Sequence, residues 1–275
     1  MKKSKLARLI AAICCFAMLL NACSSNQTPA ESGGDGSTTA DSEKKVLTYA
    51  IGAETTDLST LYMNNSLYCT SKLVYENLVD FDNGEIVPGL AESWEYNDDQ
   101  TELTFHLRQG VTFHNGEPFN AEAVKTNLEH KQSNPSFYSL KGITDIQEIE
   151  VVDEYTITLH YDHPFYAYLQ DFCWPDVNPM SAPEYIIPGD FQTISGVAGT
   201  GPYIYDEYVA GEYTRFVRNE DYWGEAPYWD EIIVKYIPDS TSRLQALQTG
   251  EIDMIYGGTL LTYEEYDQAL AMDGI

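Results

Sequence analysis

The sequence is short of basic residues. Lys and Arg together number 15 against 43 Asp and Glu, which gives a formal net charge of −28 at pH 7. A surface this acidic repels phosphate backbones, so the composition argues against a nucleic-acid partner. Four of the basic residues, Lys2, Lys3, Lys5 and Arg8, precede the first acid, Glu31. The N-terminus is therefore chemically distinct from the rest of the chain.

The sequence also lacks an apolar run long enough to cross a bilayer as a helix, which takes about 20 residues. The apolar run at residues 9–20 follows the basic N-terminus and has the length of a signal-peptide core. It leads into Leu20-Asn21-Ala22-Cys23, which resembles the lipobox of bacterial lipoproteins. This resemblance implies that residues 1–22 are a signal peptide and that Cys23 is lipidated. The exported protein would then be tethered to the outer face of the plasma membrane, on the periplasmic side in a Gram-negative cell.

Cysteine is scarce, with five residues in the chain. Cys14 and Cys15 would leave with the signal peptide, and Cys23 would carry the lipid. Only Cys69 and Cys173 remain, and they form neither a CxxC pair nor a zinc-like spacing. Export permits a disulfide, and the sequence leaves open whether these two pair.

Residues 23–45 are rich in Ser, Thr and Gly and have no apolar periodicity, so we expect a flexible tether. From Val46 onward, alternating apolar runs interleave with helical patterns, which predicts a mixed α/β fold. The predicted strands are residues 46–51, 103–107, 146–152, 155–161, 203–209, 213–217 and 231–237. A turn at Gln109-Gly110 is expected to fold residues 111–114 back as a hairpin.

Four helices are predicted. Leu67, Val74 and Leu78 share one helical face, with Asn65 or Ser66 as its cap. Three further helices are expected after Asn120 as N-cap, from about residue 241 to Gly250, and from the capping-box spacing that starts at Thr262.

Enzyme motifs are missing. The Gly-Thr-Gly at residues 199–201 lacks the third glycine of a dinucleotide fingerprint, and there is no GxSxG or Walker loop. In the expected hairpin His106 and His114 point to opposite faces, so they cannot share a metal. We therefore expect no catalysis, no cofactor and no intrinsic metal site, and a surface hydrolase is only a remote alternative.

Aromatic residues are abundant: 21 Tyr, 4 Trp and 10 Phe. Tyr and Trp combine an apolar ring with a polar tip and suit a ligand cleft, although most are expected in the core or on the surface. The candidate rings for a ligand cleft are Tyr62, Tyr68, Phe137, Trp174, Tyr222, Trp223 and Trp229.

Two ordered blocks of sequence resemble family 5 solute-binding proteins, the oligopeptide, dipeptide and nickel receptors of bacterial ABC importers. The first comprises residues 88–94 (PGLAESW) and 103–122 (LTFHLRQGVTFHNGEPFNAE). The second comprises residues 199–203 (GTGPY), 218–224 (RNEDYWG), 237–239 and 250–253. The resemblance covers essentially all of residues 46–275.

This resemblance implies a type II periplasmic-binding fold with an extra domain. Residues 46–74 and 197–275 would form lobe I, and residues 75–196 would form the inserted domain. Family members are roughly twice as long, so we expect an N-terminal fragment without the second lobe. Since both lobes grip the ligand, the affinity of one lobe is expected to be no tighter than millimolar.

The resemblance also suggests ligand-binding positions. The candidates are Glu54, Thr55, Tyr62, Met63, Tyr68, Asn134, Phe137 and Asp176. Two arginines that contact the chelator in the nickel branch are replaced by Asn134 and Asp176, and the aromatic position is Phe137. An acid there would repel a chelator carboxylate, which favours a short peptide over a nickel chelate. The expected partners are a peptide, or alternatively a nickel or metal chelate, and the permease and ATPase subunits of an ABC importer.

Overall fold

The computed structural model describes residues 44–55, 58, 60, 70–164, 166–174, 178–191, 193–257 and 261–272. The chain divides into two compact units, Met1–Ser42 and Glu43–Ile275, and the fold below is that of the second. The predicted signal peptide, Cys23 and nearly all of the tether lie outside the described residues. Within the part that is described, no helix is both long enough and apolar enough to span a membrane.

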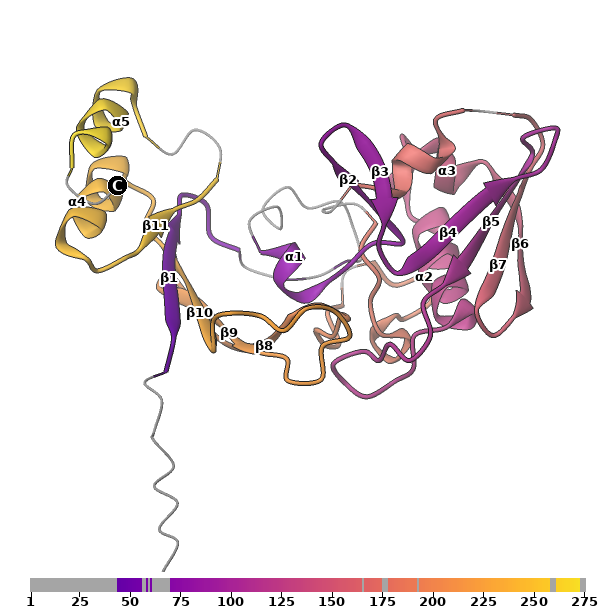
Figure 1. The fold of residues 1–275 in the computed structure, drawn as a ribbon, viewed down its shortest axis with the longest axis horizontal. Coiled ribbons are helices and arrows are strands. Elements are labelled where there is room, and N and C mark those ends of the chain that lie inside the picture. The colour runs from indigo at the N-terminus through magenta and orange to yellow at the C-terminus, as the bar shows by residue number, and fades with distance from the viewer. Residues whose placement is uncertain are drawn as a thin grey trace, which may run out of the picture. The chain divides into compact units, whose positions relative to one another are not determined.

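A five-stranded sheet is built from residues near both ends of this unit (Figure 1). Its order is β11-β1-β10-β9-β8; β1 pairs in parallel with β10 and β11, and β8, β9 and β10 pair antiparallel. The strands are β1 (Val46–Ile51), β8 (Tyr203–Val209), β9 (Tyr213–Arg218), β10 (Glu231–Tyr236) and β11 (Met254–Ile255). The four longer strands, β1, β8, β9 and β10, lie where the sequence analysis predicted strands. Tyr49, Phe216 and Val234 are buried in the core of this sheet.

A four-stranded antiparallel sheet lies in the middle of the sequence, in the order β4-β5-β7-β6. Its strands are β4 (Ala91–Tyr96), β5 (Glu102–Leu107), β6 (Ile146–Asp153) and β7 (Thr156–Tyr161), and helix α2 (Ala121–Ser133) packs on β6 and β7. The sequence predicted β5, β6 and β7 but not β4. In β5 the alternation reflects burial, because Leu103 and Phe105 are fully buried between more exposed neighbours. Asn120 caps α2 as expected by accepting from the Ala123 amide.

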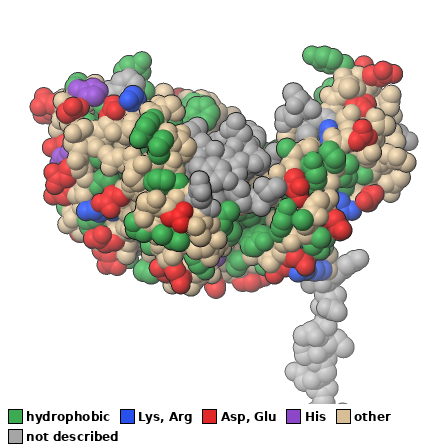
Figure 2. All heavy atoms as spheres, turned by 180° about the vertical axis from the view of Figure 1, so that it is seen from behind, with side chains coloured by type: hydrophobic (Ala, Val, Ile, Leu, Met, Phe, Trp, Pro, Cys, Tyr) green, Lys and Arg blue, Asp and Glu red, His purple; other side chains and the backbone are tan. Residues whose placement is uncertain are grey.

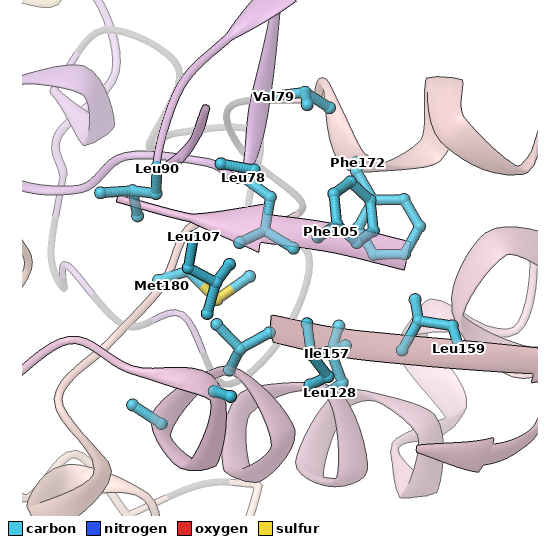
Figure 3. Close-up of a cluster of buried hydrophobic side chains, with 14 of the residues drawn as sticks. Leu78, Val79, Leu90, Phe105, Leu107, Leu128, Ile157, Leu159, Phe172 and Met180 are labelled. Carbon is cyan, nitrogen blue, oxygen red and sulfur yellow. The ribbon is translucent and has the colours of Figure 1, made fainter. Parts of the chain in front are cut away.

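The largest hydrophobic cluster joins this sheet to α2 and to the segment that follows β7 (Figure 3). The Phe105 and Phe172 rings meet edge to face with centroids 5.2 Å apart. Leu128 of α2 faces Ile157 of β7. At about 25 cal/mol per Å² of apolar area, such buried rings and aliphatic chains supply most of the stabilisation of this layer.

The remaining elements are short, apart from two helices that follow β10. They are α1 (Ser71–Val74), β2 (Val79–Asp82), β3 (Glu85–Pro88), η2 (Pro135–Phe137), α3 (Lys141–Thr144), η3 (Tyr168–Phe172), η4 (Pro183–Tyr185), α4 (Ser240–Thr249) and α5 (Tyr263–Leu270). Strands β2 and β3 pair through an Asn83-Gly84 turn in which both residues have positive φ, as a two-residue hairpin requires. Gly250 ends α4 in the left-handed conformation, and Thr262 forms the expected capping box of α5.

Two sequence predictions were wrong. The hairpin at residues 111–114 does not form, because both edges of β5 are already occupied by β4 and β7. Residues 111–119 instead close a loop of their own, in which Thr112 bridges Pro118. The helix that was to carry Leu67, Val74 and Leu78 is a single turn, α1. Leu78 lies beyond that turn, while Leu67, Asn65 and Ser66 lie outside the described residues.

Candidate ligand-binding surface and the junction behind it

The loop after β1 carries the first two predicted ligand residues. Glu54 Oε1 accepts hydrogen bonds from the Tyr208 hydroxyl at 2.7 Å and from the Gly211 amide at 2.6 Å. These two donors lower the pKa of the Glu54 carboxyl below its ordinary value, the Gly211 amide contributing most. Glu54 is therefore a fixed anion at neutral pH. Thr55, the next residue, is buried.

A hollow of about 430 Å³, open to solvent, adjoins this loop. Residues from three parts of the chain line it: Thr55, Leu58, Ile194, Val197, Tyr205, Tyr208 and Thr214. A smaller hollow of about 200 Å³ shares Ile194 and is lined by Thr60, Tyr75, Ser181, Tyr185, Ser195 and Gly196 as well. The larger hollow combines apolar walls with hydroxyl groups, the composition of a small-molecule site, whereas the smaller one has room for no more than about one water molecule.

The second pair of predicted ligand residues follows α2. The Asn134 side-chain oxygen accepts from the amide and hydroxyl of Ser136 and so caps η2. Phe137 is fully buried with Leu140 and Ile143. This pair and the Glu54–Thr55 pair thus belong to different elements. The other predicted ligand residues, Tyr62, Met63, Tyr68 and Asp176, lie outside the described residues.

Glu76 is a residue that the sequence analysis missed. Its partly buried carboxylate accepts hydrogen bonds from the Thr200 hydroxyl at 2.8 Å, from the Tyr222 hydroxyl at 2.7 Å and from the Trp223 indole at 2.7 Å. Burial raises the pKa of Glu76, and the three donors oppose that rise. Its backbone oxygen also accepts from the Met180 amide at 2.9 Å. Glu76 therefore fastens segments from four parts of the chain at one point.

The same junction explains the GTGPY block. A Cβ on Gly199 would lie 2.0 Å from the Val74 carbonyl oxygen, and a Cβ on Gly201 would lie 2.7 Å from it. The Gly201 amide donates to the Val74 carbonyl oxygen. The Gly201 carbonyl accepts from the side-chain amide of Asn219 and from His114 Nε2. Burial lowers the pKa of His114, so the ring is a neutral donor here. The glycines are thus required for close backbone approach rather than for binding phosphate.

The aromatic side chains of the two blocks support this junction. The Arg108 guanidinium lies 4.3 Å from the centre of the Trp223 ring and donates to the Gly89 carbonyl. Trp229 packs on the core of the five-stranded sheet, whereas Trp174 is 56% exposed. Tyr222 and Trp223 therefore support the junction, and among the candidate rings that the structure describes, Trp174 alone has a large exposed face.

Two of the histidines lie beside carboxylates. His160 lies between Glu102 and Glu150, and His106 lies 3.6 Å from Glu95. In the described part of the chain, no three His, Cys, Asp or Glu side chains are placed to hold a metal ion. Cys173 is a buried free thiol whose pKa burial raises to about 11, and Cys69 lies outside the described residues.

The profile of the bacterial extracellular solute-binding proteins, family 5 (middle region), matches residues 85–273, which is more than half of the chain. The chain belongs to this family. Its periplasmic-binding fold, with mixed strands and helices, is the one expected from the sequence. Members of the family are solute-binding transport proteins found outside the cytoplasm rather than enzymes.

Three relatives illustrate the range of ligands in the family. The nickel-binding periplasmic protein of Escherichia coli K12 is 36% identical over 205 residues, covering 72% of this chain and 38% of the relative. NikA from Brucella suis, solved with Fe(III)-EDTA, is 33% identical with a TM-score of 0.77, covering 84% of this chain and 47% of that one. DppA from Helicobacter pylori, solved with the peptide STSA, is 28% identical with a TM-score of 0.71, and the match covers 84% of this chain and 49% of that one. The family 5 chain thus spans less than half the length of these relatives.

Proposed function

We propose that this family 5 chain supplies part of the ligand-binding surface of an ABC importer's receptor and that the ligand is a short peptide. The observation that carries the proposal is the family match over residues 85–273, combined with a hollow whose lining residue Tyr208 is hydrogen-bonded to a fixed anion, Glu54. The chain would capture peptides outside the membrane and pass them to permease and ATPase subunits, with no chemistry of its own. Peptide backbones offer donors and acceptors that the hydroxyl-lined hollow complements.

The alternative ligand is a nickel or other metal chelate. It is favoured by two of the relatives described above, which are nickel-binding proteins by name or were solved with a metal chelate. Against it stands the charge of this chain. Carboxylates predominate over basic side chains on the face seen in Figure 2, and the whole chain carries −28. A chelate held by its carboxylates needs cationic side chains, whereas the ammonium of a peptide is attracted to a carboxylate.

The lobe boundaries are part of the same proposal. Residues 46–74 and 197–275 would form lobe I, and residues 75–196 the inserted domain. In support, the five-stranded sheet takes its strands only from the first two segments, and the four-stranded sheet takes its strands only from the third.

Glu54 is the residue proposed to hold the peptide ammonium. Replacing it with glutamine keeps its shape but removes the charge. We expect Glu54→Gln to weaken binding of trialanine about tenfold, roughly 1.4 kcal/mol, and to leave binding of N-acetyl-trialanine unchanged. Changes in amide resonances during titration of the full chain measure both affinities. Glu212→Gln, in the exposed turn after β8, is the matched control. Equal losses for both peptides would show that Glu54 acts only through structure.

Cys23 is the residue proposed to anchor the protein. Two or more acyl chains, at about 0.8 kcal/mol for each buried CH₂ group, hold a protein stably on a membrane. We expect Cys23→Ala to remain unprocessed or to be released from the membrane, and Ser24→Ala to behave like the wild type. Fractionation of cells, with mass spectrometry of the mature N-terminus, gives the result. A Cys23→Ala protein that is processed normally and stays membrane-bound would refute the anchor.

A further inference from the structure

Residues 178–182, here called the strap, cross α2 as buried chain without forming a strand. Buried backbone groups require hydrogen-bond partners, and side chains provide several of them here. Asn127 donates to the Ser181 carbonyl at 2.8 Å and accepts from the Ser181 amide at 2.9 Å. The Met180 amide donates to Glu76, and the Ala182 amide donates to the Ala198 carbonyl at 2.9 Å.

Lys131, one helical turn beyond Asn127, also contacts the strap. Lys131 is only 1% exposed. Its side-chain nitrogen donates to the Pro179 carbonyl at 2.7 Å and to Asn178 Oδ1 at 3.1 Å. A protonated lysine has three N–H donors, and the described residues supply acceptors for two. Asn178 Nδ2 is likewise buried without an acceptor among them. Neutral Lys131 has two N–H groups, which match the two acceptors.

Burial without a counter-ion makes the charged form costly. Burial is the cause that lowers the pKa of Lys131 from 10.5 to about 7. The described elements packed on α2 do carry titratable groups, but none of these contributes to that shift. They are Lys141 on α3, Glu148, Glu150 and Asp153 on β6, His160 and Tyr161 on β7, and Glu184 and Tyr185 on η4. On α2 itself the other titratable residues are Glu122, Lys125, Glu129 and His130, and the His130 ring packs at a tilt against Phe191.

We propose that Lys131 is a proton-operated clamp, which holds the strap against α2 as the neutral amine and loosens it when protonated. The strap matters beyond α2, because Ser181 lines the smaller hollow together with Tyr185 and Ile194. Its Met180 side chain also points into the main hydrophobic cluster beside Leu107 (Figure 3). Opening of the strap therefore changes the wall of the smaller hollow. Protonation of Lys131 would open the strap without any bound ligand.

The direction of the pH effect follows from proton linkage. With the strap open, Lys131 is in water and has its ordinary pKa near 10.5; with the strap closed, its pKa is about 7. Between these values the open form binds the extra proton, so closure strengthens as pH rises, by up to tenfold for each unit. Below pH 7 both forms are protonated and the effect is constant. The clamp is therefore weakest below pH 7 and tightens continuously up to about pH 10.5.

Hydrogen exchange of the full chain tests the clamp at pH 7, 8 and 9. After correction for intrinsic exchange rates, we expect protection of the Met180, Ser181 and Ala182 amides to rise about fivefold from pH 7 to 8 and close to tenfold from pH 8 to 9. In Lys131→Met the same amides should show no such rise. Amides of β7, at Ile157 and Leu159, should show no rise in either protein.

The clamp is refuted if the exchange protection of the strap amides does not change with pH in the wild type. It is also refuted if that protection changes equally in the wild type and in Lys131→Met. Should Lys131→Met fail to fold, the wild type decides alone: a pH slope confined to the strap supports the clamp, and equal slopes in the strap and β7 refute it. Lys131→Arg, charged at every pH used, should show low strap protection throughout.

Discussion

Replacing Glu76 with alanine is expected to lower the free energy of unfolding by about 3 kcal/mol. The truncation leaves the Thr200 and Tyr222 hydroxyls and the Trp223 indole N–H without their acceptor. The hydroxyls rotate toward other partners, but the indole N–H has a fixed direction and bears the full cost of desolvation. At roughly 2–4 °C for each kcal/mol, the melting temperature should fall by about 10 °C.

Glu76→Gln is the informative companion variant. Its amide oxygen can accept from Trp223 and Thr200, and its NH₂ group can donate to the Tyr222 oxygen. The indole N–H therefore keeps its acceptor, and only the Tyr222 hydroxyl proton has to turn to another one. We expect a loss below about 1 kcal/mol in urea unfolding. Glu225→Ala, at an exposed site, should be neutral. A Glu76→Ala protein as stable as Glu225→Ala would show that Glu76 does not hold the junction.

The raised pKa of Glu76 makes the stability difference between the wild type and Glu76→Gln depend on pH. Because the unfolded chain loses this proton at lower pH than the folded chain, the wild type loses stability relative to Glu76→Gln as pH rises from about 4.5 through the raised pKa. The difference in unfolding free energy between the two proteins, measured across that window, reports the sign directly.

Local patterns were enough to predict most strands and the helix caps. Leu103, Phe105 and Leu107 alternate because one face of β5 meets the core, and Asn120 stands where the first free amides of α2 need an acceptor. The hairpin prediction failed for a non-local reason. Gly110 does turn the chain, but β4 and β7 already occupy the edges of β5, and no local pattern reveals that occupancy.

The polar core was harder to predict than the apolar one. The Thr200, Tyr222 and Trp223 partners of Glu76 lie 124 to 147 residues away in sequence, so nothing near Glu76 marks it. A signal did exist for the strap. Asn127 and Lys131 continue the helical spacing of the buried Val124 and Leu128, which places polar side chains on the inner face of α2.

The largest functional effect expected is discrimination between peptides and metal chelates. At the positions that carry chelator arginines in the nickel branch by resemblance, this chain has Asn134, occupied with capping η2, and Asp176, outside the described residues. Phe137, at the aromatic position, is fully buried. Glu54 adds a fixed negative charge beside the larger hollow. Since we propose that a peptide ammonium binds at Glu54, we expect an ammonium-bearing ligand to bind at least about tenfold more tightly than an anionic chelate, a difference of about 1.4 kcal/mol.

One titration tests this selectivity most directly. Proton–nitrogen spectra of the full chain are recorded while trialanine is added up to millimolar concentration, and in a separate series while the dianion Ni²⁺–EDTA is added. We expect trialanine to shift the amide resonances of Glu54, Thr55 and Tyr208, and Ni²⁺–EDTA to leave them unchanged at equal concentration. Shifts or broadening of these resonances by Ni²⁺–EDTA at a lower concentration than trialanine requires would contradict this selectivity, and would identify the chain as part of a metal-chelate receptor.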